Sequence, residues 1–483
     1  MTTEPVAEPA TEAPVETSTA GQTEPFDLCG ALPVGTTVLE ASAGTGKTFA
    51  IAALAARYVA EGVPLERMLL VTFTRMATGE LRERVRERLL SVLKGLDLHL
   101  AGRPVDPTDA VLNLLATGPP AAVAVRRARL ATAVAGFDAA TITTTHGFCQ
   151  QMLASLGLAG NAESDLTIVE DIEDLLAETV DDLVLARVRR GQAYQLRRRQ
   201  ALATARAALE QPGTPLADVP AEPGSAERQR YNLARTVRTR MEERKRRARV
   251  ITYDDLLTRL AAAIAHPVGG PSAVRRLRRR FDVVLVDEFQ DTDRLQWLIL
   301  ARAFKPEVSP IPQASEEPEP GAAPRALVLI GDPKQAIYAF RGADVHAYLD
   351  ATRHAVVRTL DVNWRTDQAL VDAANALFHP SRLGHPDIVY RPVRAAPCHQ
   401  EPGLVGAPET AALRFRVLHR DDGLVRRTST GWAQVAPSRA VIAKDLAADV
   451  VRLLSSGAET LERDDAGVVV ARRRIRPGDI AVL

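Results

Sequence analysis

The chain has 483 residues, of which 46% are hydrophobic and 25% are charged, and its formal net charge is +1. This composition is typical of a globular protein and excludes collagen-like or mostly disordered chains. No apolar run approaches the roughly 18 residues of a membrane span, and residues 1–24 lack the features of a signal peptide. Cys29, Cys149 and Cys398 are too widely spaced for a disulfide framework or a metal site. We therefore expect a soluble, cytoplasmic protein with no membrane segment.

The N-terminal segment, residues 1–25, differs in composition from the rest of the chain. It is rich in Pro, Glu, Thr and Ala, and it contains no Lys or Arg. A segment with so little apolar surface to bury does not offset the entropy lost on ordering. We expect a disordered tail, and the remaining chain is more basic than the total charge suggests.

A glycine-containing loop follows the apolar run 36–39 and precedes a helical pattern that begins at Phe49. Such a strand, loop and helix binds phosphate because backbone N–H groups converge on the anion at a helix N-terminus. Lys47 adds a positive charge, and Thr48 offers a hydroxyl to Mg²⁺. The usual pattern begins with Gly where this chain has Ala41, which leaves a chance small-residue turn as the alternative. The expected nucleotide-binding residues are Ala41, Ser42, Ala43, Gly44, Thr45, Gly46, Lys47 and Thr48.

Further apolar runs alternate with helical patterns along the chain. Residues 68–73, 139–145, 281–286 and 326–330 have the composition of buried strands. This alternation predicts an α/β fold with a doubly wound parallel sheet, whose ligand lies at the carboxyl ends of the strands. Asp287 and Glu288 end the 281–286 run, where one carboxylate can hold Mg²⁺ and the other can polarise an attacking water.

Residues 151–249 have helical periodicity throughout and contain clusters of arginine, which predicts a helical insertion without strands. Its basic run at 244–249 could follow a nucleic-acid backbone. A solvated helix face explains such a run equally simply, and we favour that alternative for the run taken alone.

Four sequence blocks together resemble the UvrD/Rep group of superfamily-one DNA helicases, and within it the RecB subunits of RecBCD helicase-nucleases. They are Glu-Ala-Ser-Ala-Gly-Thr-Gly-Lys-Thr-Phe at 40–49, Thr-His-Gly-Phe-Cys-Gln at 145–150, Asp-Glu-Phe-Gln-Asp-Thr-Asp at 287–293 and Gly-Asp-Pro-Lys-Gln-Ala-Ile-Tyr at 331–338. The resemblance implies a P-loop, RecA-like fold and an ATP-dependent helicase that moves 3′ to 5′ on DNA. It also implies single-stranded and double-stranded DNA ends as substrates, RecC-like and RecD-like partner subunits, and a role in double-strand break repair.

The resemblance assigns roles to matched positions in the ATP site. It implies that Lys47 and Thr48 bind the phosphates and Mg²⁺, that Asp287 anchors the metal, and that Glu288 is the catalytic base. It further implies that Gln335 and Arg365 contact the γ-phosphate and that Trp364 stacks on adenine. The family's adenine-reading Gln has no counterpart at 26–33, which leaves the base preference open.

A second set of matched positions faces single-stranded DNA in the family. These positions are Thr72, Phe73, His146, Tyr338 and Phe340. Aromatic faces stack on any base, which suits a motor that does not read sequence. Plain core packing is the alternative for Phe73, Tyr338 and Phe340.

The domain division that we expect follows from these patterns. Residues 26–150 and 250–355 form the first RecA-like motor domain, and 151–249 form the insertion, which contacts DNA. Residues 356–483 begin a second RecA-like domain, with strands at 356–360 and 480–483, and we expect it to be incomplete and loosely docked. The nuclease of the family lies in a region that this chain does not contain.

Two alternatives to a DNA translocase remain open, a scaffold and a P-loop ATPase of another class. The chain is either a translocase or a catalytically incomplete ATP-binding and DNA-binding scaffold, and DNA-stimulated ATP hydrolysis discriminates between them. A P-loop ATPase of another class, such as a transporter motor, requires a signature loop that we do not find.

Overall fold

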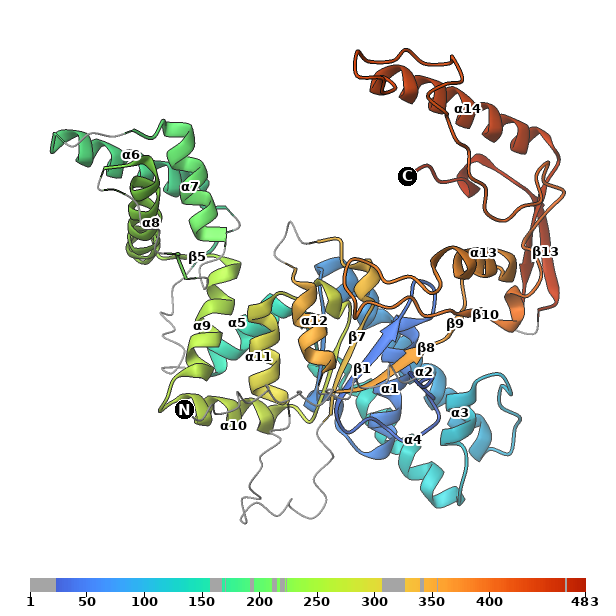
Figure 1. Cartoon of the computed structure of the whole chain (residues 1–483). Helices are drawn as coiled ribbons and strands as arrows, with labels where there is room; N and C mark the ends of the chain where they lie inside the picture. The colour runs from blue at the N-terminus through green and yellow to red at the C-terminus, as the bar shows by residue number, and fades with distance from the viewer. Residues whose placement is uncertain are drawn as a thin grey trace, which may run out of the picture.

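A central parallel sheet organises the computed structural model, which describes residues 23–156, 167–169, 171–191, 195–210, 215–217, 222, 224–305, 326–338, 343–353, 355–464 and 467–483. Six strands lie in the order β3-β2-β6-β7-β1-β8 (Figure 1), and every neighbouring pair is parallel. Their bounds are Gly35–Ala41 (β1), Met68–Thr72 (β2), Thr141–Thr144 (β3), Val283–Val286 (β6), Ala326–Gly331 (β7) and Val356–Leu360 (β8). The predicted α/β class is confirmed.

Alternating side chains of the strands enter two separate cores, one on each face of the sheet. Leu39 and Leu285 pack in the first core, and Val38 and Val284 pack in the second. Strands buried on both faces are expected to be apolar without alternation, as these are. The first face is covered by α1 (Lys47–Glu61), α2 (Arg75–Leu100), α3 (Ala110–Leu115) and α4 (Pro120–Ala135). The second is covered by α5 (Thr145–Leu156), α9 (Tyr253–Ala265), α10 (Gly270–Arg280), α11 (Arg294–Phe304) and α12 (Val345–Thr352).

Strand β8 occupies an edge of this first sheet. Its residues pair with β1 from Thr37↔Val356 to Ala41↔Leu360. The prediction that a second sheet begins at Val356 is therefore wrong, because the short apolar run completes the sheet that carries the glycine loop. Phe26 N donates to Thr359 O at 2.8 Å, and Thr359 N donates to Glu24 O at 3.2 Å. Residues 24–26 thus pair with β8, which corrects the expectation of a disordered tail through residue 25; residues 1–22 lie outside the described part.

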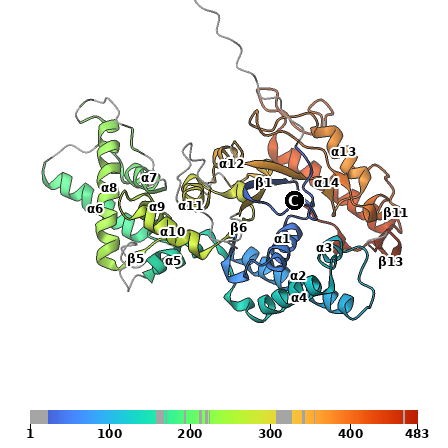
Figure 2. The same ribbon diagram turned by 90° about the horizontal axis from the view of Figure 1, so that it is seen from below.

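Three helices, α6 (Glu173–Arg189), α7 (Arg198–Glu210) and α8 (Ala226–Ala248), form a separate body with its own small core around Val180, Val237 and Met241. Figures 1 and 2 show this body standing away from the sheet on the side of α9. Two details correct the prediction. Residues 151–156 belong to α5 and pack in the second core, so the insertion begins later. Strands β4 (Thr167–Ile168) and β5 (Val250–Ile251) pair with each other, so the segment contains a strand.

The chain beyond β8 contains fewer buried side chains. Strands β9 (Val362–Asn363) and β10 (Arg394–Ala395) pair beside α13 (Gln368–Phe378). Helix α14 (Val435–Ser455) has no buried residue, and it lies apart from the central sheet together with β11 (Leu404–Val405), β12 (Glu459–Arg463) and β13 (Val469–Arg474). Residues 480–483 form no strand. They follow a 3₁₀ turn, Pro477–Asp479, that separates them from β13, the last strand of its sheet. The predicted strand there is wrong. The segment 306–324 is rich in Pro and Glu, which predicts a surface loop, and it lies outside the described residues.

Within the described ranges, no helix combines the length and the apolarity needed to cross a membrane.

Candidate functional site

The glycine loop between β1 and α1 has the geometry that a phosphate cradle requires. Gly44 and Gly46 have φ values of +80° and +83°, which only glycine adopts without strain. Thr45 N and Oγ1 both donate to Ser42 O, at 3.3 and 2.8 Å, and close the loop. Helix α1 starts at Lys47 immediately after the loop. The N–H groups of its first turn and its dipole therefore point toward the loop, where they favour an anion.

The acidic pair predicted after β6 lies opposite Lys47. Lys47 Nζ is 2.7 Å from Glu288 Oε2. Glu288 has a φ of 49°, one of two positive values among the described non-glycine residues, and its N–H donates to Asp287 Oδ1 at 2.9 Å. Such strain persists only where the surroundings over-determine it, and it is concentrated at functional sites. In this ligand-free state the loop lysine is thus paired with the candidate base.

Burial perturbs the pKa of two carboxyl groups beside this pair. Burial and the charge of Glu288 raise the pKa of Asp287 to about 6, although Lys47 opposes the rise. The same two causes raise the pKa of Asp291 to about 6. A buried carboxyl group at the end of a strand, without enough positive charge around it, fits a divalent cation. Mg²⁺ in nucleotide sites uses one or two protein oxygens plus phosphates, and the Asp287 carboxylate and the Thr48 hydroxyl have this donor chemistry.

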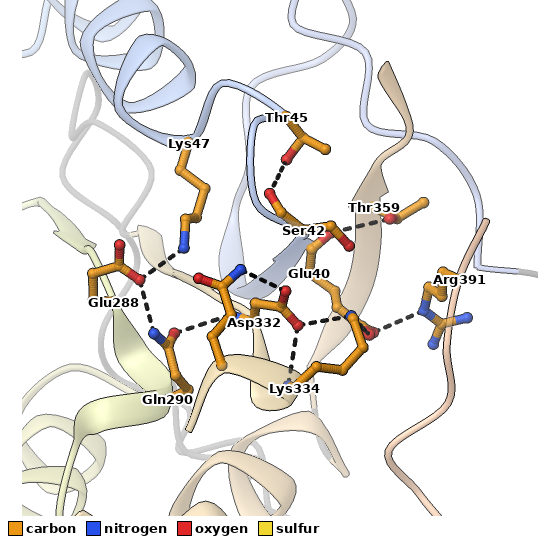
Figure 3. A network of polar contacts seen from close by, with 11 residues as sticks. Glu40, Ser42, Thr45, Lys47, Glu288, Gln290, Asp332, Lys334, Thr359 and Arg391 are labelled. Carbon is orange, nitrogen blue, oxygen red and sulfur yellow. Dashed lines mark hydrogen bonds and ion pairs between the residues drawn. The ribbon is translucent and has the colours of Figure 1, made fainter. Parts of the chain in front are cut away.

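Two residues that the sequence reasoning missed, Gln290 and Asp332, connect Glu288 to Gln335; Figure 3 shows Glu288, Gln290 and Asp332. Gln290 Nε2 donates to Glu288 Oε2 at 2.8 Å, and Gln290 Oε1 accepts from Asp332 N at 2.9 Å. Asp332 Oδ2 then accepts from Gln335 Nε2 at 2.7 Å. A Cβ at Gly331 would stand 2.7 Å from Gln290 Oε1 and 3.1 Å from Gln290 N, so a larger residue there would displace the Gln290 side chain. Gln290 lies two residues after Glu288, and this short spacing was the signal in the sequence that could have identified it.

The segment after β8 contacts the glycine loop directly. Asn363 Nδ2 donates to Ala43 O at 3.1 Å, and Trp364 N donates to Gly44 O at 2.7 Å. A Cβ at Gly44 would lie 3.0 Å from Arg365 Cβ. Trp364 and Arg365 therefore stand at the glycine loop, with Trp364 54% exposed. Their contacts with adenine and the γ-phosphate stay predictions. The expectation that this part of the chain is loosely docked is wrong for residues 363–365, and Asn363, which fixes them, was missed.

Three of the five predicted DNA-facing residues, Phe73, His146 and Tyr338, form contacts between aromatic rings. The rings of Phe73 and Tyr338 stack with centroids 5.6 Å apart and an interplanar angle of 24°. His146 meets Tyr253 edge to face at 5.5 Å, and burial lowers its pKa, which keeps it neutral near pH 7. Thr72 is only 1% exposed because it ends a central strand, so its side chain is not available to DNA. Phe340 lies outside the described residues.

A cavity of about 760 Å³ opens between the rings of Phe73, His146 and Tyr253 and the three helices α6, α7 and α8. Phe73, His146 and Tyr253 line it from the sheet side, and charged residues of both signs line it from α6, α7 and α8. Tyr253, which accepts a hydrogen bond from Arg75, was not predicted from the sequence.

The basic run 244–249 on α8 is partly used within the molecule. Arg244 pairs with Glu178 and Asp182, and Lys245 pairs with Glu242 and Asp255. Lys245 is buried. The pairs with Glu178 and Asp182 tie α8 to α6, and the pair with Asp255 ties it to α9, whereas Glu242 lies on α8 itself. Arg244 and Lys245 are thus used within the molecule, and the buried Lys245 does not belong to a solvated face.

A phosphate loop, a strand-end acidic pair and a glutamine at the neighbouring strand end, all on one edge of a doubly wound parallel sheet, define a P-loop nucleoside triphosphatase. Residues 28–355 match the family model of the UvrD/REP helicase N-terminal domain. The chain belongs to this helicase family.

Curated relatives of the chain carry the name RecBCD enzyme subunit RecB. The protein of Mycolicibacterium smegmatis is 46% identical over 439 residues, which cover 90% of this chain and 37% of that protein. The protein of Mycobacterium tuberculosis H37Rv is 42% identical over 95% of this chain and 39% of its own length. The Escherichia coli K12 protein is 33% identical over 51% of this chain and 19% of its own length. The chain thus spans less than two fifths of the relatives that it matches.

Proposed function

We propose that this chain is the ATP-hydrolysing part of a RecB-like, ATP-dependent DNA helicase that moves 3′ to 5′ along single-stranded DNA. The observation that carries the proposal is the connected set Lys47, Glu288, Gln290, Asp332 and Gln335 at the carboxyl edge of the sheet. These groups connect the phosphate loop to Gln335, which precedes Tyr338 by three residues in the chain, and this suits a motor that couples nucleotide state to DNA contact.

The residues at the loop perform distinct tasks. Lys47 leaves Glu288 when phosphates enter the cradle, because the ammonium group then has a stronger anionic partner. The freed Glu288 carboxylate accepts the proton of the attacking water. Gln335 and Arg365 contact the γ-phosphate, and Trp364 stacks on the base. Thr48 and Asp287 would hold Mg²⁺, which would supply positive charge against the phosphates.

DNA binding uses stacking and charge. Phe73, Tyr338 and His146 offer aromatic faces beside the cavity, and such faces bind any base. We therefore infer affinity for single-stranded DNA that is largely independent of sequence and falls with salt.

The wider setting follows the relatives. We infer that the chain works on double-stranded DNA ends with RecC-like and RecD-like subunits, in double-strand break repair in the cytoplasm. We also infer a first motor domain from 26–150 and 250–355, which β8 extends. A helical insertion within 151–249 lies against the cavity that Phe73, His146 and Tyr253 line. The remaining chain forms part of a second motor domain.

DNA-stimulated phosphate release from ATP tests the proposal. Lys47→Ala should abolish turnover while the circular dichroism spectrum and the melting temperature stay close to those of the parent chain. Lys444→Ala, an exposed lysine on α14, is the matched control. Unchanged turnover in Lys47→Ala contradicts the assignment of the loop. Binding of ATP and DNA without any hydrolysis by the parent chain favours the scaffold alternative.

A further inference from the structure

A buried carboxylate lies directly beneath the phosphate loop and faces two cations. Glu40, near the end of β1, has a side chain that is 9% exposed. Its Oε2 is 2.8 Å from Arg391 Nε, and its Oε1 is 3.6 Å from Lys334 Nζ. Figure 3 shows Glu40 between these two residues. Burying a charge costs several kcal/mol unless partners remain in place, so Glu40 depends on both cations.

Lys334 stands between two carboxylates. Its Nζ is 2.7 Å from Asp332 Oδ1, and its side chain is 10% exposed. The other oxygen of Asp332 accepts the hydrogen bond from Gln335 Nε2 at 2.7 Å. Asp332 is 2% exposed. The position of Lys334 therefore decides how the charge of Asp332 is balanced, and Asp332 holds Gln335.

Arg391 is the one member of this chain of charges that comes from beyond β8. It lies next to Tyr390, whose hydroxyl donates to Asn375 Oδ1 on α13 at 3.0 Å. Val393 N also donates to Asn375 Oδ1, at 3.3 Å. These bonds tie the Arg391 segment to α13, so a displacement of α13 relative to β1 changes the distance between Arg391 and Glu40.

We propose that Glu40 is a positioning residue that couples the placement of the α13 segment to Gln335. When Arg391 withdraws, Glu40 keeps a counter-charge only by drawing Lys334 away from Asp332. The unbalanced Asp332 then holds Gln335 more tightly, away from the nucleotide. When Arg391 returns, Lys334 moves back and Gln335 is available to the γ-phosphate. This inference rests on the proposed ATP site, in which Gln335 contacts the γ-phosphate.

Discrimination between ATP and ADP is the measurement that isolates this coupling. Gln335 acts on the γ-phosphate, which ADP lacks, whereas damage to the loop beneath which Glu40 lies weakens both nucleotides. We expect Arg391→Gln to reduce the preference for ATP over ADP by about tenfold, within the usual range of coupling between sites. Glu40→Gln removes the carboxylate that draws Lys334 away from Asp332, so it should retain most of the preference. Affinity for ADP should stay nearly constant. Arg391→Lys, which keeps the charge, should retain much of the preference.

One control variant and one double variant complete the experiment. Arg394→Gln removes a more exposed arginine of the same segment, which pairs with Asp361, and it should leave the preference unchanged. The double variant Glu40→Gln/Arg391→Gln should regain most of the preference that Arg391→Gln loses, because without the Glu40 carboxylate Lys334 stays at Asp332. Melting curves check folding, and the half-buried Arg391 carries the test alone if the Glu40 variant does not fold.

The outcomes test the coupling through Glu40 and the ATP site separately. Equal weakening of ATP and ADP, a double variant that regains none of the preference, or an unchanged preference in Arg391→Gln overturns the coupling while the ATP site stands. A parent chain that binds neither nucleotide overturns the ATP site and the coupling together.

Discussion

Replacing Glu288 by Gln should separate ATP binding from ATP hydrolysis. The amide keeps the size of the side chain, and its oxygen still accepts from Gln290, but it removes both the proposed base and the anion that holds Lys47. Side-chain exposures of 12% for Lys47 and 35% for Glu288 place their ion pair near the surface, where such pairs contribute roughly 0.2 to 1 kcal/mol. Without that competing partner, ATP should bind equally well or up to about fivefold tighter.

Turnover should move in the opposite direction. Loss of a general base lowers the rate by about two to four orders of magnitude. The assay combines ATP titration by fluorescence with phosphate release in the presence of single-stranded DNA. Glu83→Gln, an exposed glutamate on α2, is the matched control. Parallel loss of binding and turnover would show that Glu288 supports the fold, and undiminished turnover would place the base elsewhere.

Three further changes test neighbouring parts of the site. Tyr338→Ala should weaken single-stranded DNA binding by about 1 to 3 kcal/mol in a filter-binding titration, whereas the exposed Trp432→Ala should not; a fall in melting temperature with unchanged DNA affinity would identify the Tyr338 ring as core. Asp291 is 6% exposed, and its folded pKa of about 6 lies above its ordinary value of 3.8, so its contribution to stability is greatest below pH 4 and is lost as the pH rises through 6, by at most roughly 1.4 kcal/mol per pH unit. Asp291→Asn should flatten that part of the stability curve measured by urea unfolding, and an unaltered curve contradicts the assignment. Gly44→Ala should weaken ATP binding by at least about tenfold, because its Cβ would stand 2.8 Å from Asn363 Oδ1 at a φ of +80°; unchanged titration would refute the tight contact.

Local patterns in the sequence were sufficient for the individual elements near the nucleotide. The loop at 42–46 was predictable because phosphate binding needs glycines, a lysine and a helix start at fixed short spacing. Strands β2, β6 and β7 were predictable because burial on both faces demands continuous apolar runs. The acidic pair Asp287 and Glu288 followed from its place at the end of such a run. Each of these inferences depends on residues that are neighbours in the chain.

Tertiary structure decided what depends on pairing between distant segments. An apolar run does not state which strand it joins, so only the structure shows that β8 pairs with β1 in the first sheet. The run at 480–483 had strand composition but forms no strand. Thr72 is enclosed by its neighbours in the sheet, which no local pattern reveals. Glu40 and Arg391 lie 351 residues apart in the chain, and their contact exists only because the fold closes that distance. Hydrophobic periodicity encodes which face of an element is buried, whereas charge pairing between elements is fixed only when the sheet is assembled.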